Sequence, residues 1–537
     1  MDGSADDATP RRTMLKRAAF LLSVVLALLA LLTFARETPP ITTDSDLAVG
    51  EIYTQLAGET RLLLGPYSRF GWHHPGPLYF YVQAPLYVLS GRRAAALYAG
   101  ALAINLLALV TIALVVRREN QGALPVVVVA ACLLFCLRAP RFLASPWTAH
   151  VTVLPLLACV ALGAAILSGR RLLPLLVIFG SFVVQTHVGL APPVAALFAI
   201  MLAIVLVERR PPPVRMRSML LTCGWIGLLL WLPTLIDAAS HQGGNLAALV
   251  RFFARGGQQD HSLTEALIDW SYGLTGLLRW DFGLPWGAHF VVTNLWWVMP
   301  CAIGELLGVA VIARRELHAG RRFEGYLVML MVAASVAGLW SLTRVRDDIL
   351  DHEIFWLAAL GSMNLAVIVA AAGRAIRAAT AQGPPSHQRA ATIGLPLVLL
   401  LGAALGADHL QDFTSFELRR VERRQIVDAY EAIREYMRNQ HVRRPLIRID
   451  AAVWSQAAGV LLRLRRDRSE VAVADEWVPM FTDAFAANGR EDAIVIVGRG
   501  RAGRAATDLP GVPGVLLFES AAIHVEVTLT PKIEGGR

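Results

Sequence analysis

The chain has 537 residues, of which 55% are hydrophobic and only 17% are charged, and its mean hydropathy is +0.51. This composition excludes an ordinary soluble protein and indicates one that spans a membrane many times, with room for one modest soluble domain. The net charge of +9 comes almost wholly from arginine, because Lys16 and Lys532 are the only lysines, so it does not indicate a nucleic-acid partner. The five cysteines all lie in apolar segments and signal neither a disulfide framework nor a zinc site.

About eleven apolar segments are long enough to cross a bilayer as helices. They lie near residues 15 to 35, 94 to 116, 121 to 138, 147 to 168, 172 to 190, 191 to 207, 218 to 236, 289 to 313, 325 to 343, 354 to 373 and 392 to 407. The first resembles a signal peptide in its basic flank, but its length and the lack of a clean cleavage site favour an uncleaved helix. We therefore expect an α-helical polytopic fold.

Arginine collects in alternate short loops, and this bias predicts the orientation of the helices. If the N-terminus is cytoplasmic, every predicted inside loop is basic, for example at Arg117 and Arg118 and at Arg170 and Arg171. Segments 36 to 93 and 237 to 288 then become long external loops. The second of these reads as a pair of interfacial helices that could cover a site as a lid.

An odd number of spans places residues 408 to 537 outside the cytoplasm. Residues 417 to 437 have the apolar spacing of a helix, and β-like runs follow at 446 to 450, 471 to 474 and 493 to 498, with a helix-like segment at 454 to 465. Strands that alternate with helices predict a small α/β domain. The expected division is thus a transmembrane domain at 1 to 407 and an extracytoplasmic domain at 408 to 537.

The first external loop carries two aspartates at the start of a predicted amphipathic helix. In TTDSDLAVGEIYTQLAGE, residues 42 to 59, Asp44 and Asp46 precede Glu51. Carboxylates at a helix N-terminus are stabilised by the helix dipole, so these residues could merely cap an interfacial helix. Alternatively, one of them lies beneath a hydrophobic roof and accepts a proton from an incoming hydroxyl.

The segment GPYSRFGWHHPGPLYFY, residues 65 to 81, combines aromatic rings with cationic and hydrogen-bonding side chains. Its aromatics alone could form a belt at the headgroup level. A belt does not need Arg69, His73 and His74 in the same segment, whereas a guanidinium beside aromatic rings suits a phosphate with a sugar attached.

These two stretches together resemble the first external loop of the GT-C superfamily of polyprenyl-phosphate-sugar glycosyltransferases, including protein O-mannosyltransferases and the aminoarabinose transferases of lipid A. The resemblance rests on Asp44 to Asp46, Glu51-Ile52-Tyr53, Gly58-Glu59 and His74-Pro75-Gly76-Pro77-Leu78-Tyr79. It implies about eleven to thirteen spans, a lipid-phosphate donor and an acidic base in this loop. Asp46 matches the spacing of the family base better than Asp44, and both remain candidates.

Many relatives carry a second acid in the second external loop, which helps to hold a divalent metal in some of them. Here that loop, residues 138 to 150, contains no acid. The sequence therefore names no cofactor with certainty, and a divalent metal lacks the support of a second acidic loop. The loop offers Arg138, Arg141 and His150 instead, which either snorkel at helix ends or form a phosphate-binding rim with Arg69.

Three further residues complete the candidate binding set. Gln185 and His187 lie near the external end of the fifth span, where polar groups either line a cavity or form an interhelical hydrogen bond. Arg344 lies near the external end of the ninth span, where GT-C members often bind the donor phosphate, but its acidic neighbours make a salt-bridge cluster equally plausible.

The leading hypothesis is a hexosyl- or pentosyltransferase. It would move a sugar from a polyprenyl-phosphate donor to the hydroxyl of a lipid, glycan or protein acceptor on the outer face of the cell membrane. Asp46 or Asp44 would take the hydroxyl proton, and arginines would neutralise the departing lipid phosphate. The alternatives are a polytopic transporter or lipid flippase, and a catalytically inactive GT-C-like binding protein.

Overall fold

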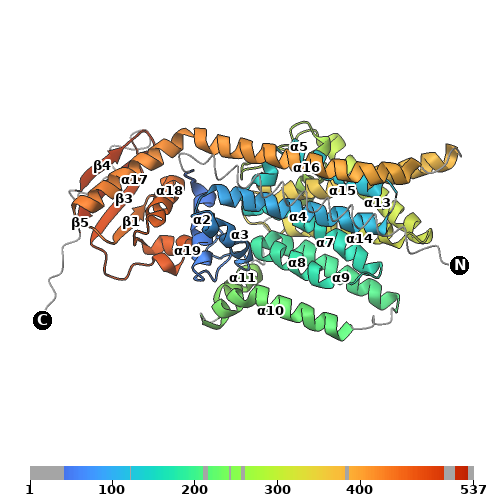
Figure 1. The fold of residues 1–537 in the computed structure, drawn as a ribbon, viewed down its shortest axis with the longest axis horizontal. Coiled ribbons are helices and arrows are strands. Elements are labelled where there is room, and N and C mark those ends of the chain that lie inside the picture. The colour runs from blue at the N-terminus through green and yellow to red at the C-terminus, as the bar shows by residue number, and fades with distance from the viewer. Residues whose placement is uncertain are drawn as a thin grey trace.

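The computed structural model describes residues 41–120, 122–209, 216–240, 243–255, 261–380, 386–500 and 514–529. The predicted first helix at residues 15 to 35 lies outside these ranges. A long bundle of helices occupies most of the molecule, and a small sheet with its own helices lies beyond one end of it (Figure 1).

Helices match all ten predicted spans that fall within the described residues. They are α4 (Ala95–Glu119), α5 (Leu124–Arg138), α6 (Thr148–Val151) with α7 (Val153–Leu167), α8 (Leu173–Thr186), α9 (Ala191–Val207), α10 (Met216–Ser240), α13 (Leu295–His318), α14 (Arg322–Leu342), α15 (Asp351–Thr380) and α16 (Ser386–Arg419). Within the described residues, seven helical segments are long and apolar enough to cross a membrane. The helices α5 and α8 are apolar but shorter, so the number of spans stays a prediction.

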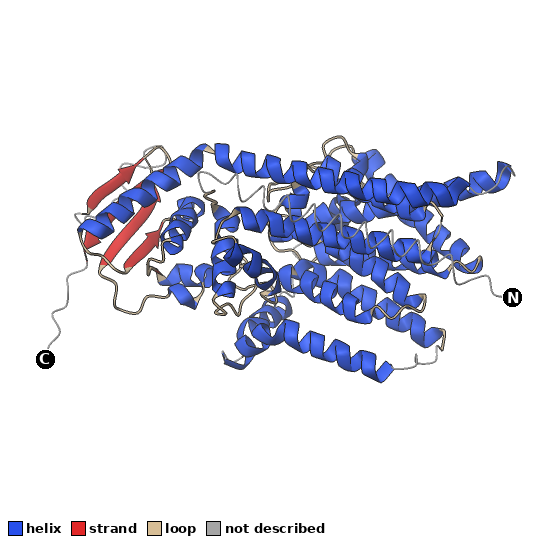
Figure 2. Ribbon diagram, in the orientation of Figure 1, coloured by secondary structure: helices blue, strands red, loops and turns tan. Residues whose placement is uncertain are grey.

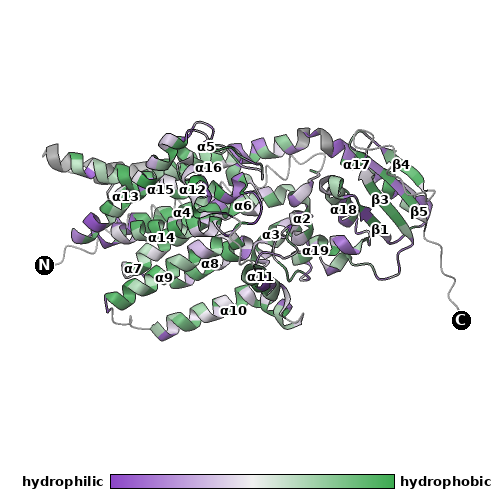
Figure 3. Cartoon of the chain, turned by 180° about the vertical axis from the view of Figure 1, so that it is seen from behind, coloured by the Kyte–Doolittle hydropathy of each residue, from purple (hydrophilic) through white to green (hydrophobic). Residues whose placement is uncertain are grey.

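The helix α7 forms the centre of the bundle because almost every one of its side chains is buried. Small residues allow neighbouring helices to approach α7 closely. A Cβ at Gly163 of α7, for example, would lie only 2.8 Å from a methyl carbon of Leu330 in α14. The outer helix α10 instead exposes apolar side chains, including Trp225 and Leu229. Hydrophobic residues cover the helices of the bundle (Figure 3), as a lipid-facing surface requires.

The strands gather into one five-stranded sheet in the C-terminal part (Figure 2), in the order β2-β1-β3-β5-β4. The strands are β1 (Pro445–Ile449), β2 (Ala472–Val473), β3 (Ala493–Arg499), β4 (Val515–Glu519) and β5 (Ile523–Leu529). The strand β1 pairs in parallel with β2 and β3, whereas β5 is antiparallel to β3 and β4. The predicted fold class, a helical membrane protein with a small C-terminal α/β unit, is confirmed.

Two helices accompany this sheet, α17 (Val421–Asn439) and α18 (Trp454–Arg466). The apolar spacing predicted near residues 417 to 437 corresponds to α17, whose Ile426, Ala429 and Ile433 are buried. Because α16 continues unbroken past residue 408 to Arg419, the bundle and the sheet unit are joined by a helix. The division at residue 408 stays a prediction.

The segment after the predicted first span, which we expected to be external, folds into α2 (Ser45–Gly58) and α3 (Leu78–Leu89). We expected an amphipathic helix at the membrane surface, but α2 is buried from Ala48 to Ala57 with the sole exception of a half-buried Gly50. The reason is that α2 packs against α3 on one side and against α18 of the C-terminal unit on another. The aspartates at its start therefore lie where the two parts of the molecule meet.

Candidate functional site

A cavity of about 1070 Å³ opens at the junction of the bundle and the C-terminal unit. Its wall is built from the start of α2, the loop 59 to 77, the segment before α6, the ends of α8 and α14, helix α11 (Gly244–Arg255), the start of α15 and two segments of the C-terminal unit. Five of the predicted site residues line it, namely Asp46, Arg69, His74, His187 and Arg344.

Asp46 lies in the first turn of α2 with its side chain open to the cavity. The indole Nε1–H of Trp147 donates a hydrogen bond to its Oδ2 at 3.1 Å. Protein surrounds the carboxyl deeply enough that desolvation raises its pKa, while the Trp147 hydrogen bond and the nearby His352 oppose this rise. Asp46 is thus a carboxylate of increased basicity with one oxygen, Oδ1, left for another partner.

Asp44 is placed differently, although it lies only two residues away. Its buried carboxylate binds the Arg420 guanidinium through two hydrogen bonds, at 2.7 Å and 2.8 Å. The carboxylate does not cap α2, and it does not line the cavity. Between the two aspartates, Ser45 has a positive φ of 53°, a left-handed conformation that costs energy for a residue with a side chain. The Asp44 to Arg420 ion pair ties the α2 start to the segment between α16 and α17.

His74 and His187 stack face to face on the cavity wall, with ring centroids 4.9 Å apart. The Val188 backbone N–H donates to His74 Nδ1 at 3.0 Å, so the neutral ring carries its proton on Nε2. Burial, followed by the neighbouring histidines, holds the pKa of His74 well below its usual value. His74 is therefore a neutral hydrogen-bond donor rather than a cation.

His73 does not line the cavity, and its contacts are structural. Its backbone N–H donates to Asn245 Oδ1 at 2.8 Å, and its carbonyl accepts from Asn245 Nδ2 at 2.7 Å. Its ring Nε2 lies 3.2 Å from the Tyr53 hydroxyl. Desolvation lowers the pKa of His73 to about 4, so the ring is neutral at physiological pH. These contacts connect the histidine loop to α11 and α2.

Arginines reach the cavity from two segments of the bundle. Arg69 belongs to the loop 59 to 77 and lies 3.6 Å from Asp347 in a largely exposed ion pair. Arg344 and Arg346 follow α14, where Arg344 lies over the Trp340 ring at 5.3 Å and Arg346 over the Phe252 ring at 4.1 Å. Within the described part of the chain, Arg344 forms no ion pair. Of the four residues expected at a phosphate-binding rim, only Arg69 lines the cavity, together with Arg344 and Arg346.

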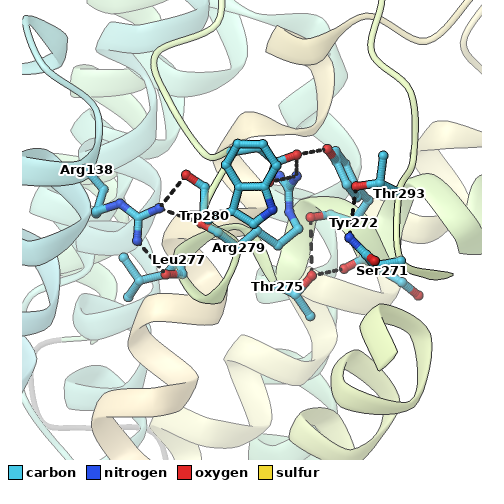
Figure 4. Close-up of polar contacts among 10 residues, drawn as sticks. Arg138, Ser271, Tyr272, Thr275, Leu277, Arg279, Trp280 and Thr293 are labelled. Carbon is cyan, nitrogen blue, oxygen red and sulfur yellow. Dashed lines mark hydrogen bonds and ion pairs between the residues drawn. The ribbon is translucent and has the colours of Figure 1, made fainter. Parts of the chain in front are cut away.

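The structure does not bring Arg138 to this rim. Its guanidinium donates to the backbone carbonyls of Leu277, Arg279 and Trp280 and so holds the loop that follows α12 (Leu263–Leu274), as Figure 4 shows. Arg141 does not reach the rim either. It binds Asp412 at 2.7 Å and covers the Phe416 ring, so it ties the second external loop to α16. Both arginines oppose the charge bias of the loops because they serve packing.

His150 and Gln185 are buried behind the cavity wall. His150 Nε2 donates to the Pro285 carbonyl at 3.0 Å, which leaves Nδ1 to accept from the Ser145 hydroxyl at 2.7 Å. Gln185 donates to the Leu230 carbonyl at 3.0 Å and forms an interhelical hydrogen bond. Of the two roles expected for Gln185, lining a cavity or forming an interhelical hydrogen bond, the structure shows the hydrogen bond.

The sequence reasoning omitted several residues that line the cavity. Trp147 and Trp286 stack 6.0 Å apart, and His352 lies 4.9 Å from the Trp147 ring. Glu353 brings a second carboxylate to the same wall, where it also accepts from the Leu350 backbone N–H at 2.9 Å. The acidic segment that contains Glu353 was the sequence signal for this part of the wall, but that segment indicated a structural salt-bridge cluster equally well.

A divalent metal does not fit the residues observed. Over the described ranges, no three His, Cys, Asp or Glu side chains come together in a metal-binding arrangement. Asp46 accepts a hydrogen bond from an indole, and Glu353 accepts one from a backbone N–H.

Comparison with known proteins shows the fold. No family model and no curated protein matches the sequence. ArnT from Cupriavidus metallidurans in the apo state is similar at a TM-score of 0.50 and 12% identity, over 95% of this chain and 98% of that one. The same protein bound to undecaprenyl phosphate gives a TM-score of 0.49 and 11% identity, over 97% and 99% of the two chains. The Archaeoglobus fulgidus oligosaccharyltransferase tethered with an acceptor peptide gives a TM-score of 0.41 and 12% identity, over 89% of this chain and 69% of that one. The expected resemblance to the GT-C fold is confirmed.

Proposed function

We propose that this protein is a membrane glycosyltransferase that moves a sugar from a polyprenyl-phosphate donor to an acceptor hydroxyl. The observation that supports this most directly is a single cavity that contains both an accessible carboxylate of raised pKa, on Asp46, and arginines from the bundle. A base and a cationic site are the two groups that such a transfer needs. ArnT from Cupriavidus metallidurans, whose apo state shares this fold, binds undecaprenyl phosphate, and this supports a lipid phosphate as the donor carrier.

Asp46 is proposed as the general base. The acceptor O–H donates to Oδ1 of Asp46, the acceptor oxygen attacks the anomeric carbon, and the proton passes to the carboxylate as the new C–O bond forms. Attack from the face opposite the phosphate inverts the anomeric configuration. Desolvation helps because an ionised carboxylate of raised pKa is a stronger base than an ordinary aspartate.

Arg69 and Arg344 are proposed to receive the leaving group. As the bond from the anomeric carbon to the phosphate oxygen breaks, its electron pair stays on the polyprenyl phosphate, and guanidinium groups stabilise that charge. Rings suited to a prenyl chain lie beside Arg69, because its guanidinium lies 5.1 Å from the centre of the Phe70 ring. The Phe252 ring lies 5.4 Å from both the Phe70 ring and the Trp72 ring, centre to centre. Neutral His74 supplies an additional hydrogen-bond donor.

The proposed setting is the outer face of the cell membrane. The N-terminus would lie in the cytoplasm, and residues 408 to 537 would form an extracytoplasmic domain beside the transmembrane domain at residues 1 to 407. Basic loops support this orientation, because Arg117, Arg171 and Arg321 all lie at ends of bundle helices remote from the sheet unit.

The deciding experiment is to incubate the purified protein in lipid with a panel of polyprenyl-phosphate sugars and to measure the release of polyprenyl phosphate. We expect turnover of at least one donor, and a loss of about 10²–10⁴-fold in Asp46→Asn, because this change removes the base but keeps the shape of the side chain. A matched control is Asp428→Asn, an exposed aspartate on α17 remote from the cavity.

Full activity in Asp46→Asn, with normal folding, would remove Asp46 from its role as base. No turnover of any donor would contradict the glycosyltransferase proposal itself and would return the transporter alternative to consideration.

A further inference from the structure

Charge is distributed unevenly around the cavity. The arginines Arg69, Arg344 and Arg346 all belong to the bundle and its loops. The C-terminal unit contributes a different wall, and its described lining residues are Ala451, Trp454, Trp477 and Met480, none of which is charged. The cavity therefore has a cationic side and a neutral, aromatic side.

The two tryptophans of the neutral side are held in place without being covered. The indole N–H of Trp477 donates to the Ile449 carbonyl at 3.0 Å, which fixes the ring against the end of β1. Trp454 begins α18, and in the described part of the chain its indole N–H has no hydrogen-bond partner. Both rings are half-buried. Two indole surfaces and one free donor are thus available to a ligand in the cavity.

The neutral side adjoins the proposed base. The helix α18 packs on the start of α2, where a Cβ at Gly459 would lie 2.8 Å from the Thr43 carbonyl oxygen. The Tyr53 hydroxyl of α2 donates to the Met480 carbonyl at 2.6 Å. Because Asp46 lies in the first turn of α2 and also lines the cavity, its carboxylate and this wall face the same space.

We propose that Trp454 and Trp477 form the acceptor subsite and that the acceptor is an uncharged sugar of a glycan. This inference rests on the glycosyltransferase function proposed above. Indole faces pack well against the C–H face of a pyranose, and an exposed indole N–H can donate to a sugar hydroxyl. An acceptor that carries a phosphate or carboxylate would find no cation among the described residues of this wall, whereas the arginines on the other wall serve the donor. The reacting hydroxyl then meets Asp46 between the two.

The test uses the full-length protein in lipid with a donor on which it turns over. Acceptor probes are the methyl pyranosides of glucose, galactose and mannose, each paired with its 6-phosphate. We expect transfer to at least one neutral pyranoside and weaker transfer to its 6-phosphate. In Trp454→Ala the KM for that pyranoside should rise about tenfold, since a lost aromatic contact of this size corresponds to roughly that factor. Trp477→Ala should act in the same direction.

Donor hydrolysis by water serves as the internal reference, because it needs the base and the arginines but not the acceptor subsite. In both tryptophan variants donor hydrolysis should fall much less than transfer to the pyranoside, and the hydrolysis that remains also shows that the variants fold. Trp454→Phe should give an intermediate KM. The control is Trp280→Ala, since Trp280 is exposed on the loop after α12 and does not line the cavity.

Three results would overturn the inference while leaving the glycosyltransferase function intact. They are donor hydrolysis without transfer to any neutral pyranoside, a preference for the 6-phosphates, and an unchanged KM in Trp454→Ala and Trp477→Ala. A failure of the underlying function looks different, because no donor would then be consumed even by water, and the inference would fall with it.

Discussion

At the scale of single residues, the contact between Trp147 and Asp46 is the most informative one in the cavity. A hydrogen bond to an ionised carboxylate lowers its pKa, and here it acts against the desolvation that raises the pKa. Trp147 thus limits how far burial raises the pKa of the Asp46 carboxyl. The second external loop, which contains no acid, contributes to the site through this indole.

Replacing Trp147 by phenylalanine should move the acidic limb of the pH profile upward. Removal of the indole donor raises the pKa of Asp46 further, so the base becomes protonated at a higher pH and transfer is lost earlier on acidification. The measurement is kcat/KM for donor turnover as a function of pH. Trp280→Phe is the matched control, and an acidic limb at the same pH in both variants would exclude Asp46 as the titrating group.

The sequence predicted the aspartate pair but could not choose between its members. Spacing favoured Asp46. The structure distinguishes the two through Arg420, which lies 376 residues from Asp44 along the chain and binds both oxygens of the Asp44 carboxylate. For Arg138, the sequence could not reveal the partners that the side chain binds. Its position against the charge bias predicted a phosphate contact, but the carbonyls that it binds lie about 140 residues further along the chain, where no local pattern reveals them.

At the scale of elements, α2 depends on the helices on either side of it. Glu51 is fully buried in the middle of α2 and accepts two hydrogen bonds of 2.7 Å from Arg466 of α18. It also accepts from the Tyr87 hydroxyl of α3 at 2.8 Å. One carboxylate therefore joins three helices, and the position of Asp46 one turn earlier depends on this junction.

Arg466→Met should lower the free energy of unfolding by about 3–5 kcal/mol, because it leaves the Glu51 charge buried without its partner. The double variant Glu51→Met/Arg466→Met should recover most of this loss, since an apolar pair carries no desolvation cost. Chemical unfolding of the protein in detergent would measure both values.

Arg465→Met is the matched control for this junction. Arg465 binds Glu59 at 2.6 Å, but that pair is partly exposed to solvent, so its loss should cost only about 0–1 kcal/mol. Equal destabilisation by Arg465→Met and Arg466→Met would contradict the special role of the buried pair.

At the scale of the whole molecule, the cavity exists only because the sheet unit docks on one end of the bundle. The bundle supplies arginines, histidines and Asp46, and the C-terminal unit supplies the wall with Trp454 and Trp477. The two parts lie end to end in Figure 1, with the start of α2 between them. Under the proposed function, a donor embedded in the bilayer and an acceptor from the aqueous side would meet at the Asp46 carboxylate.

This arrangement predicts the sidedness of the chain. An impermeant maleimide applied to intact cells should label Arg490→Cys, which is exposed in the sheet unit, and should not label Arg171→Cys, which is exposed between α7 and α8 at the opposite end. Permeabilised cells should label both. The native cysteines lie within bundle helices, and the unsubstituted protein measures their background. The reverse labelling pattern would place the cavity in the cytoplasm and contradict the proposed orientation.

The sequence by itself determined the helical segments, the C-terminal α/β pattern and the loop that contains Asp46. These features follow from periodicity, apolar length and charge bias, which act over neighbouring residues. The strands β4 and β5 were missed, although Ile523, Val525 and Val527 alternate as buried residues of a strand should.

Only the tertiary structure decided which side chains share the cavity. It brought Trp147, His352 and Glu353 to Asp46, buried α2 on both sides, and assigned Arg138 and Arg141 to packing. The physical reason is that a cavity wall is made of segments hundreds of residues apart. Their meeting depends on ion pairs and ring contacts across helices, and no local pattern in the chain records these contacts.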